Sequence, residues 1–383
     1  MQKRWLSLAF LLSAAAFPAL PLTLVGAFGT AACNTADLKN NDGTSGGTTS
    51  GGPGVGDDAE IPIDDSGRDP VKDLDGGVIP TSTNVTIQVL PPQAGDTGIS
   101  VEDAIKAAKT SVHMTMYLLT DTSVQNALIA LKNAGKDVKV ILNKTFPPNG
   151  GDNTTSFNKL KNAGVDVVYA PSAYTFTHAK TVIIDNAKVL IMTMNLTQTS
   201  SNREYVATDS DPADVADCEK LFAADYGNLQ VNVSGKLVVS PQQTTPVDAR
   251  ARLRAVIDSA KTSLDVEVQS LSDDGLTDAI VLAHKDSVAV RVVIASGNDE
   301  TPAQAESIAK LKAAGVPLRR VAAPYIHAKA VVVDGTRVFV GSQNFTPTAL
   351  LQNREIGVVT DAPAEAAKVQ KVIAADFAVG VAP

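Results

Sequence analysis

The chain has 383 residues, 44% hydrophobic and 19% charged, which is the composition of a folded globular protein and leaves room for two domains or one duplicated domain. Its formal net charge is -8, but ten of the 41 acidic residues and five of the 33 basic residues precede residue 80. The remaining body is nearly neutral, which argues against a protein that grips nucleic acid along its backbone. Two cysteines exclude a disulfide framework or a cysteine metal site, and no metal or other cofactor is expected.

The first 32 residues predict an export signal. Lys3 and Arg4 give a basic start, an apolar stretch covers residues 5–28, and small residues stand just before Cys33. This order resembles a bacterial lipoprotein signal, in which cleavage leaves the cysteine as the lipidated first residue. The resemblance implies an exported protein, anchored to the membrane of the bacterial cell envelope through Cys33, at the periplasmic or outer surface. An ordinary secretory signal with an incidental cysteine, or an uncleaved anchor helix, is the alternative.

Residues 33–80 predict a disordered linker. The segment is rich in Gly, Ser and Thr and then in Asp, so it lacks the apolar side chains that a core requires. No calcium-loop ligand order is present in its acidic part. We therefore expect a solvated tether between the anchor and the body.

The body repeats itself, which predicts two similar lobes over residues 82–232 and 236–380. Residues 107–112 match 259–264 at an offset of 152, and residues 159–165 match 310–316 at an offset of 151. Helical spacing predicts helices over 101–109, 123–134, 248–261 and 275–284, and others that end at Gly164 and Gly315. Strands are predicted over 112–119 and 264–271, from 138 and 288, and in hairpins that turn at 185–186 and 334–335. Strands that alternate with helices predict an α/β sandwich.

Each lobe contains one His-x-Lys pair on a predicted strand. The pairs are His178 with Lys180 and His327 with Lys329, and side chains two residues apart on a strand point to the same side. The next strand of each hairpin returns toward them and carries a hydroxyl and an amide, and an Asn-Arg-Glu triplet follows. These residues are Thr193, Asn195 and Glu204 in lobe one, and Ser342, Asn344 and Glu355 in lobe two. Two such half-sites across a pseudo-two-fold axis predict one active site at the interface between the lobes.

The residue types suit phosphodiester chemistry. Two ammonium groups with amide and hydroxyl donors stabilise the charge that grows on phosphate oxygens. One imidazole can attack phosphorus while the other gives a proton to the leaving alcohol. A carboxylate, Glu204 or Glu355, can hold the second ring nitrogen of a histidine and fix its tautomer. An ion pair between each glutamate and its adjacent arginine is the structural alternative. Asp185 and Asp334 lie at odd offsets from the pairs, so we expect turn or ion-pair roles for them.

The pattern H-x-K-x4-D-x6-G-S-x-N resembles that of the phospholipase D superfamily. The second copy matches it throughout, including Gly341, whereas Met192-Thr193 replaces Gly-Ser in the first copy. The resemblance implies lobes with mixed sheets sandwiched by helices, His178 as the nucleophile and His327 as the acid. We expect activity to survive the loss of the glycine, with Met192 narrowing the pocket near lobe one.

The favoured function is a metal-independent phospholipase D-like phosphodiesterase that hydrolyses phospholipid to phosphatidic acid and a head-group alcohol through a phosphohistidine. Transfer to an alcohol, as in cardiolipin synthesis, is one alternative. A metal-independent endonuclease of the same superfamily is another, and the neutral body makes nucleic acid the less favoured partner. A non-catalytic phosphate-binding lipoprotein is the third. We expect a monomer, since both half-sites belong to one chain.

Overall fold

The computed structural model describes residues 78–92, 98–147, 151–197, 201–233, 236–241, 248–296 and 301–383. The predicted export signal, Cys33 and most of the predicted linker lie outside the described residues. In this described part of the chain, no helix is long and apolar enough to cross a membrane.

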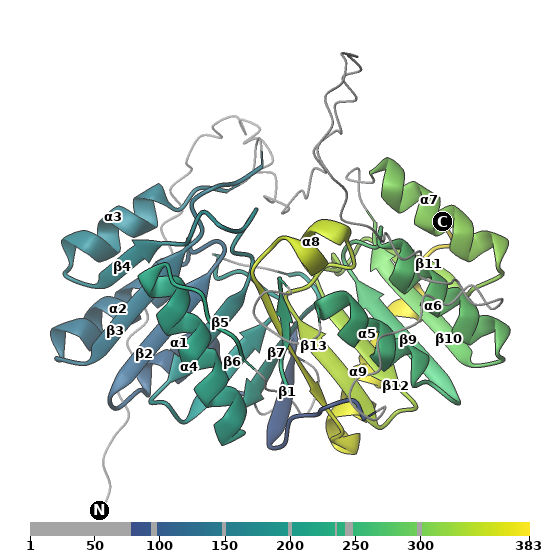
Figure 1. Cartoon of the computed structure of the whole chain (residues 1–383), viewed down its shortest axis with the longest axis horizontal. Coiled ribbons are helices and arrows are strands. Elements are labelled where there is room, and N and C mark those ends of the chain that lie inside the picture. The colour runs from purple at the N-terminus through teal and green to yellow at the C-terminus, as the bar shows by residue number, and fades with distance from the viewer. Residues whose placement is uncertain are drawn as a thin grey trace, which may run out of the picture. The chain divides into compact units, whose positions relative to one another are not determined.

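Lobe one alternates helices and strands as its sequence predicts (Figure 1). Its elements are β1 (Val85–Leu90), α1 (Val101–Lys106), β2 (Ser111–Met116), α2 (Thr122–Asn133), β3 (Asp137–Leu142), α3 (Thr154–Asn162), β4 (Asp166–Tyr169), β5 (Lys180–Ile184), β6 (Lys188–Met192), β7 (Glu204–Asp209) and α4 (Pro212–Gly227). Local chemistry sets several boundaries. The Asp121 carboxylate accepts from the Ser123 N–H at the start of α2, and Gly164 follows α3 with a φ of +79°, a conformation that glycine adopts without strain.

Lobe two repeats this order and also contains a short helix between its last two strands. Its elements are β8 (Val238–Ser240), α5 (Ala249–Asp258), β9 (Ser263–Val268), α6 (Asp274–Lys285), β10 (Ala289–Ala295), α7 (Pro302–Ala313), β11 (Leu318–Val321), β12 (Lys329–Val333), β13 (Arg337–Gly341), α8 (Pro347–Leu351), β14 (Glu355–Thr360) and α9 (Pro363–Val379). The two hairpin turns are also as predicted, because Asp185-Asn186 and Asp334-Gly335 all have positive φ angles, which suit a two-residue turn between twisted strands.

The two sheets have the same topology. Each has seven strands, in the order β1-β7-β6-β5-β2-β3-β4 in lobe one and β8-β14-β13-β12-β9-β10-β11 in lobe two. The pairs β2–β3 and β3–β4 are parallel, whereas β5, β6 and β7 join antiparallel, so each sheet is mixed. The predicted fold class, two similar α/β lobes with helices on both sides of a mixed sheet, is confirmed.

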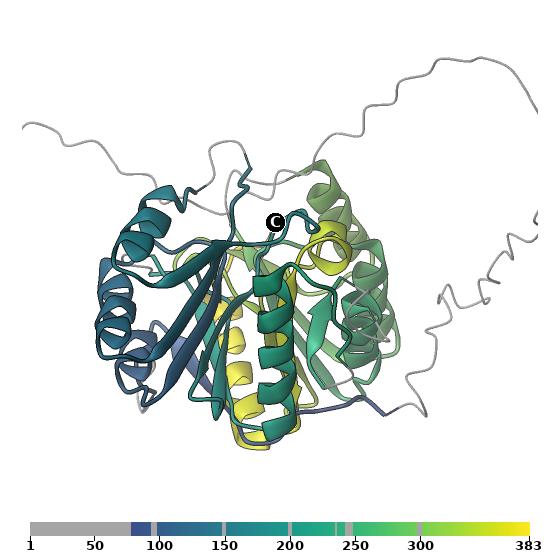
Figure 2. The same cartoon turned by 60° about the vertical axis from the view of Figure 1, so that its left-hand side comes forward.

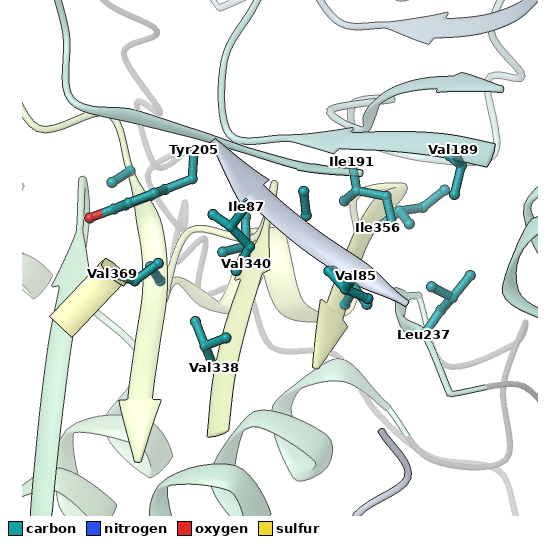
Figure 3. Close-up of a cluster of buried hydrophobic side chains, with 14 of the residues drawn as sticks. Val85, Ile87, Val189, Ile191, Tyr205, Leu237, Val338, Val340, Ile356 and Val369 are labelled. Atoms are coloured by element: carbon teal, nitrogen blue, oxygen red, sulfur yellow. The ribbon is translucent and has the colours of Figure 1, made fainter. Parts of the chain in front are cut away.

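Helices α4 and α9 run between the two sheets, while α1–α3 and α5–α7 cover the outer faces (Figure 2). The core follows this layering. Each outer face has its own hydrophobic cluster, and a third cluster is shared by both lobes (Figure 3). The shared cluster joins β1, β6 and β7 to β13, β14 and α9 through side chains such as Ile87, Ile191, Val340, Ile356 and Val369. A common apolar core joins the lobes, so their sheets hold the site between them as one unit.

Candidate active site

The first His-x-Lys pair lies at the start of β5. His178 is buried, and its Nδ1 lies 2.9 and 3.0 Å from the two carboxylate oxygens of Glu355, which begins β14 of the other lobe. Its Nε2 is also buried and has no hydrogen-bond partner among the described residues. One ring nitrogen is therefore fixed by a carboxylate, and the other is left for chemistry.

The second pair has the reciprocal arrangement at the start of β12. His327 Nδ1 lies 2.8 Å from Oε1 of Glu204, which begins β7 of lobe one. The two atoms are close enough for an ion pair, but their geometry is not that of a hydrogen bond. Burial alone would raise the pKa of Glu204, but His327 and then Lys329 outweigh it and hold that pKa below its ordinary value. Glu204 is therefore ionised where it meets the imidazole.

Each Asn-Arg-Glu triplet contacts the histidine of the opposite lobe. The backbone carbonyl of Arg354 accepts from the N–H groups of His178 and Ala179 at 2.9 and 2.8 Å, and that of Arg203 accepts from the His327 N–H at 3.2 Å. Because backbone and carboxylate both cross between the lobes, neither half-site is complete within its own lobe. Sequence spacing could not show this crossing, since each glutamate follows its own lobe's histidine in the chain.

The arginines of the triplets form a second crossed pair of contacts, which we call the arginine latches. Arg354 bonds both oxygens of Asp225 on α4 at 2.8 and 2.9 Å, and Arg203 bonds both oxygens of Asp376 on α9 at 2.6 and 3.1 Å. All four side chains are buried. The alternative of a pair between each arginine and its adjacent glutamate is thus wrong. Asp225 and Asp376 are 151 residues apart, the same offset as the triplets, so the repeat contained a signal for them.

The two lysines are fully buried but have different surroundings. Each Nζ donates to the backbone carbonyl of the histidine two residues earlier, at 2.5 Å for Lys180 and 2.7 Å for Lys329. Lys329 also donates to Gln269 Oε1 at 3.1 Å, whereas Lys180 Nζ lies 5.0 Å from the ring centroid of Tyr117. Tyr117 and Gln269 are 152 residues apart and occupy equivalent positions after β2 and β9. Sequence reasoning missed both, because they differ in type and carry no motif.

The predicted amides and hydroxyls take different roles. Asn344 is fully buried, yet neither polar atom of its amide has a hydrogen-bond partner among the described residues, as expected of a group that awaits a ligand. Asn195 is half-buried at the equivalent place. The hydroxyls do not face a phosphate as expected. Thr193 Oγ1 donates to Glu204 Oε2 at 2.5 Å, and Ser342 Oγ donates to the Ile356 carbonyl at 3.3 Å. They fix neighbouring groups instead.

Asp185 and Asp334 lie at the hairpin turns, away from the histidines. Oδ1 of Asp185 accepts from the Thr110 and Ser111 N–H groups at 2.7 and 3.0 Å, and Asp334 makes the equivalent bonds to Thr262 and Ser263. Burial opposes the effect, but the backbone N–H groups of Lys109, Thr110 and Ser111 and the Thr110 hydroxyl lower the pKa of Asp185 to about 2. The geometry is that of a turn that ties the hairpin to β2 or β9.

Met192 fills core volume. The side chain is fully buried in the outer cluster of lobe one, so the expectation that it narrows the pocket is wrong. In lobe two, a Cβ on Gly341 would lie 2.3 Å from Gln343 Oε1, 2.7 Å from Gly357 Cα and 2.8 Å from Phe339 Cζ. The glycine is therefore required by the close approach of the Gly357 backbone and of the Gln343 and Phe339 side chains, and lobe one has a different set of side chains there.

In the part of the chain that the structure describes, no group of three or more His, Cys, Asp or Glu side chains is placed to hold a metal ion. The groups that the structure does bring together are two imidazoles with crossed carboxylates, two buried ammonium groups and an unpartnered amide.

The family described as "Cardiolipin synthase, PLD-like domain" matches twice, over residues 101–226 and 253–377. The chain belongs to this family. The predicted membership of the phospholipase D superfamily is confirmed, and the two matches coincide with the two lobes that surround the site.

Similar proteins include both hydrolases and synthases. Mitochondrial cardiolipin hydrolase of Xenopus tropicalis is 39% identical over 114 residues, 30% of this chain and 53% of that protein. The chain thus spans about half the length of the curated relatives it matches at this level. Minor cardiolipin synthase ClsB of Bacillus subtilis is 24% identical over 310 residues, 71% of this chain and 77% of that protein. The structure of phosphatidylserine synthase from Haemophilus influenzae has 12% identity, a TM-score of 0.59 and covers 78% of this chain and 87% of its own, which shows a common fold.

Proposed function

We propose that this protein is a phosphatidyl-transferring phosphodiesterase, which moves the phosphatidyl group of a phospholipid to an alcohol through a phosphohistidine. The observation that carries the proposal is the crossed pair of His–Glu contacts with two buried lysines in one site. The sequence favoured hydrolysis, with transfer as the alternative. The relative that resembles both lobes is named a cardiolipin synthase, which supports the alternative.

In the first step, His178 attacks phosphorus. Its Nδ1 is held by Glu355, so the buried Nε2 carries the lone pair that forms the P–N bond. The P–O bond to the head-group alcohol breaks, its electron pair stays on the oxygen, and His327 gives that oxygen a proton. Glu204 stabilises the protonated form of His327 before the transfer.

In the second step, an acceptor hydroxyl gives its proton to the now neutral His327 and its oxygen attacks phosphorus. The P–N bond breaks and its electron pair returns to His178. Lys180, Lys329 and the Asn344 amide stabilise the phosphate oxygens in both steps, because charge-assisted donors in a dry site are strong. Water competes with the alcohol at this stage.

Hydrolysis is the second candidate, because the relatives of higher identity are named cardiolipin hydrolases. Those similarities cover about 30% of this chain, which is less than one lobe, so they say less about a two-lobed acceptor site. Export and anchoring through Cys33 belong to the proposal as well, since an envelope protein meets phospholipid directly. We propose a monomer, and nucleic acid is the less favoured substrate.

A substrate panel tests the proposal. Full-length protein in EDTA is given vesicles of phosphatidylglycerol, cardiolipin or phosphatidylcholine, with and without added alcohol, and single-stranded DNA, with lipid products identified by mass spectrometry. We expect transfer products that increase with alcohol, no turnover by His178→Asn, and full turnover by the matched control His284→Asn, which changes a helix α6 residue. Cleavage of DNA without action on any lipid would replace the proposal by the nuclease alternative, and phosphatidic acid as the sole product at high alcohol would favour hydrolysis.

A further inference from the structure

An aromatic path leads outward from the catalytic histidine of lobe one. The rings of Tyr117 and His178 meet edge to face, with centroids 4.7 Å apart and an interplanar angle of 71°. Tyr117 in turn contacts Phe146 at 4.9 Å and Phe176 at 6.1 Å. Tyr117 is 3% exposed, while Phe146 and Phe176 are only half-buried. A continuous apolar surface therefore runs from the reacting ring to solvent, and we call Tyr117, Phe146 and Phe176 the aromatic shelf.

Among the described residues, the two outer rings of the shelf lie outside the hydrophobic core clusters. Neither Phe146 nor Phe176 belongs to, or packs against, any of the three clusters of the described residues. Phe157, another half-buried phenylalanine of lobe one, does pack on its cluster and stacks on Tyr169 at 4.1 Å. Large apolar rings beside a site without a packing role are typical of a ligand contact.

In lobe two, side chains with hydrogen-bonding groups occupy the positions equivalent to two of the three shelf residues. Gln269 replaces Tyr117, and Tyr325 replaces Phe176 at the offset of 149 that separates the two His-x-Lys segments. Gln269 Nε2 donates to the Tyr325 hydroxyl at 3.3 Å, and its Oε1 accepts from Lys329. Tyr325 also packs against the shared core. The two sides of a site built from a duplicated lobe thus differ in polarity, with aromatic groups beside His178 and hydrogen-bonding groups beside His327.

A glycerophospholipid has the same asymmetry about its phosphorus. One ester arm is diacylglycerol, which is apolar, and the other is a polar alcohol. We propose that the aromatic shelf binds the first acyl methylenes and glycerol backbone of the diacylglycerol arm, and that Gln269 and Tyr325 face the polar alcohol. This assignment rests on the proposed function and fixes the direction of substrate in the site. The phosphatidyl group stays on the side of His178, and leaving and acceptor alcohols use the side of His327.

A series of short-chain substrates tests the assignment without a lipid surface. Phosphatidylcholines with dibutyryl, dihexanoyl and diheptanoyl chains are used below their micelle concentrations with the full-length protein. Burial of one methylene is worth up to about a fourfold change in an equilibrium. We expect kcat/KM to rise along the series for the unmodified protein, and the dihexanoyl to dibutyryl ratio to fall at least fivefold in Phe146→Ser and in the independent variant Phe176→Ser.

The matched control is Phe157→Ser, the same change in the same lobe on a ring that packs in the core. It should lower stability and keep the chain-length ratio of the unmodified protein. Tyr325→Phe should change the preference between choline and glycerol head groups and keep that ratio too.

The outcomes separate the two proposals. A steep chain-length ratio that both shelf variants retain would overturn the shelf assignment and leave phosphatidyl transfer standing. Absence of turnover of every phospholipid by the unmodified protein would overturn both. If the shelf variants lost cleavage of single-stranded DNA instead, the rings would be a platform for bases and the lipid assignment would be wrong.

Discussion

Replacing Asp225 with Asn should weaken both the junction of the lobes and the catalytic histidine of lobe one. The change removes the charge from a carboxylate that bonds the Arg354 guanidinium at 2.8 and 2.9 Å. Arg354 is 1% exposed, so its positive charge stays buried without compensation. Breaking one partner of a buried pair costs about 3–5 kcal/mol, and we expect the low end because the amide oxygen still accepts one bond.

The neighbouring groups of Arg354 limit how far the guanidinium can relax. Arg354 also donates to the Ser240 carbonyl at 3.1 Å and to the Tyr174 hydroxyl. Burial is the main cause that raises the pKa of Tyr174 to about 12, with a further contribution from Asp225 and against the opposing effect of Arg354. The variant removes the contribution of Asp225 but not the burial, so the phenol stays neutral near pH 7 and cannot replace the lost carboxylate.

The same change should also lower catalysis. The Arg354 carbonyl holds the His178 backbone, and Glu355 is the next residue. A shift of the order of 1 Å in the backbone of Arg354 and Glu355 would reduce kcat by about ten- to a hundredfold. Urea unfolding at equilibrium and steady-state kinetics measure the two effects on the same protein.

The double variant Asp225→Leu with Arg354→Met is the internal control. It removes both charges, so most of the lost stability should return, because apolar replacements of a buried pair are often neutral or better. If Asp225→Asn cost less than about 1 kcal/mol, or if the double variant were no more stable than the single one, the latch would not be the buried, coupled pair described above.

Further predictions concern residues outside the site. Met192→Gly should lower the free energy of unfolding by about 2–5 kcal/mol in urea titrations, because it leaves a cavity in the core. Gly341→Ala should lower it by about 1–3 kcal/mol, because the added methyl group overpacks the core. An unchanged stability in either variant would contradict the packing described for that residue. Burial opposes protonation of His113, but Glu219 and then Asp137 raise its pKa above the ordinary 6.5, so its stabilisation is present below that pH and is lost as pH rises through the folded pKa. His113→Gln should therefore destabilise more at pH 5.5 than at pH 8.5, and an equal loss at both would count against the ion pair. Burial raises the pKa of Asp209 from 3.8 to about 7, so the stabilisation of the fold by the protonated carboxyl is present below the first value and is lost as pH rises through the second. Asp209→Asn should therefore raise the free energy of unfolding at pH 8 by about 1–3 kcal/mol in thermal or urea unfolding. An unchanged stability at pH 8 would argue against a buried carboxyl.

The fold was predictable because the duplication supplied each signal twice. Glycines after helices and the Asp-containing turns mark element ends locally, so helices and strands fall within a few residues of their predicted bounds. The family could be predicted for the same reason, since the His-x-Lys pairs recur at a constant offset.

The partners within the site could not be predicted, because they depend on how two lobes face one another. Glu204 follows His178 in the chain but pairs with His327, and no spacing rule reports a contact between lobes. Thr193 was expected at a phosphate and instead bonds Glu204, a difference that follows from the turn of β6 into β7. Met192 appeared to be a lost glycine until Gly341 proved to be a requirement of packing around Phe339.

The most direct test of the account is to identify the residue that carries the phosphatidyl group. Full-length protein is mixed with phospholipid, stopped during turnover at alkaline pH, where phosphohistidine survives, and its peptides are sequenced by mass spectrometry. We expect an adduct on His178 that disappears in His178→Asn and diminishes in Glu355→Gln, the variant of its partner in the other lobe. An adduct on His327 instead, or turnover by His178→Asn at the full rate, would contradict it.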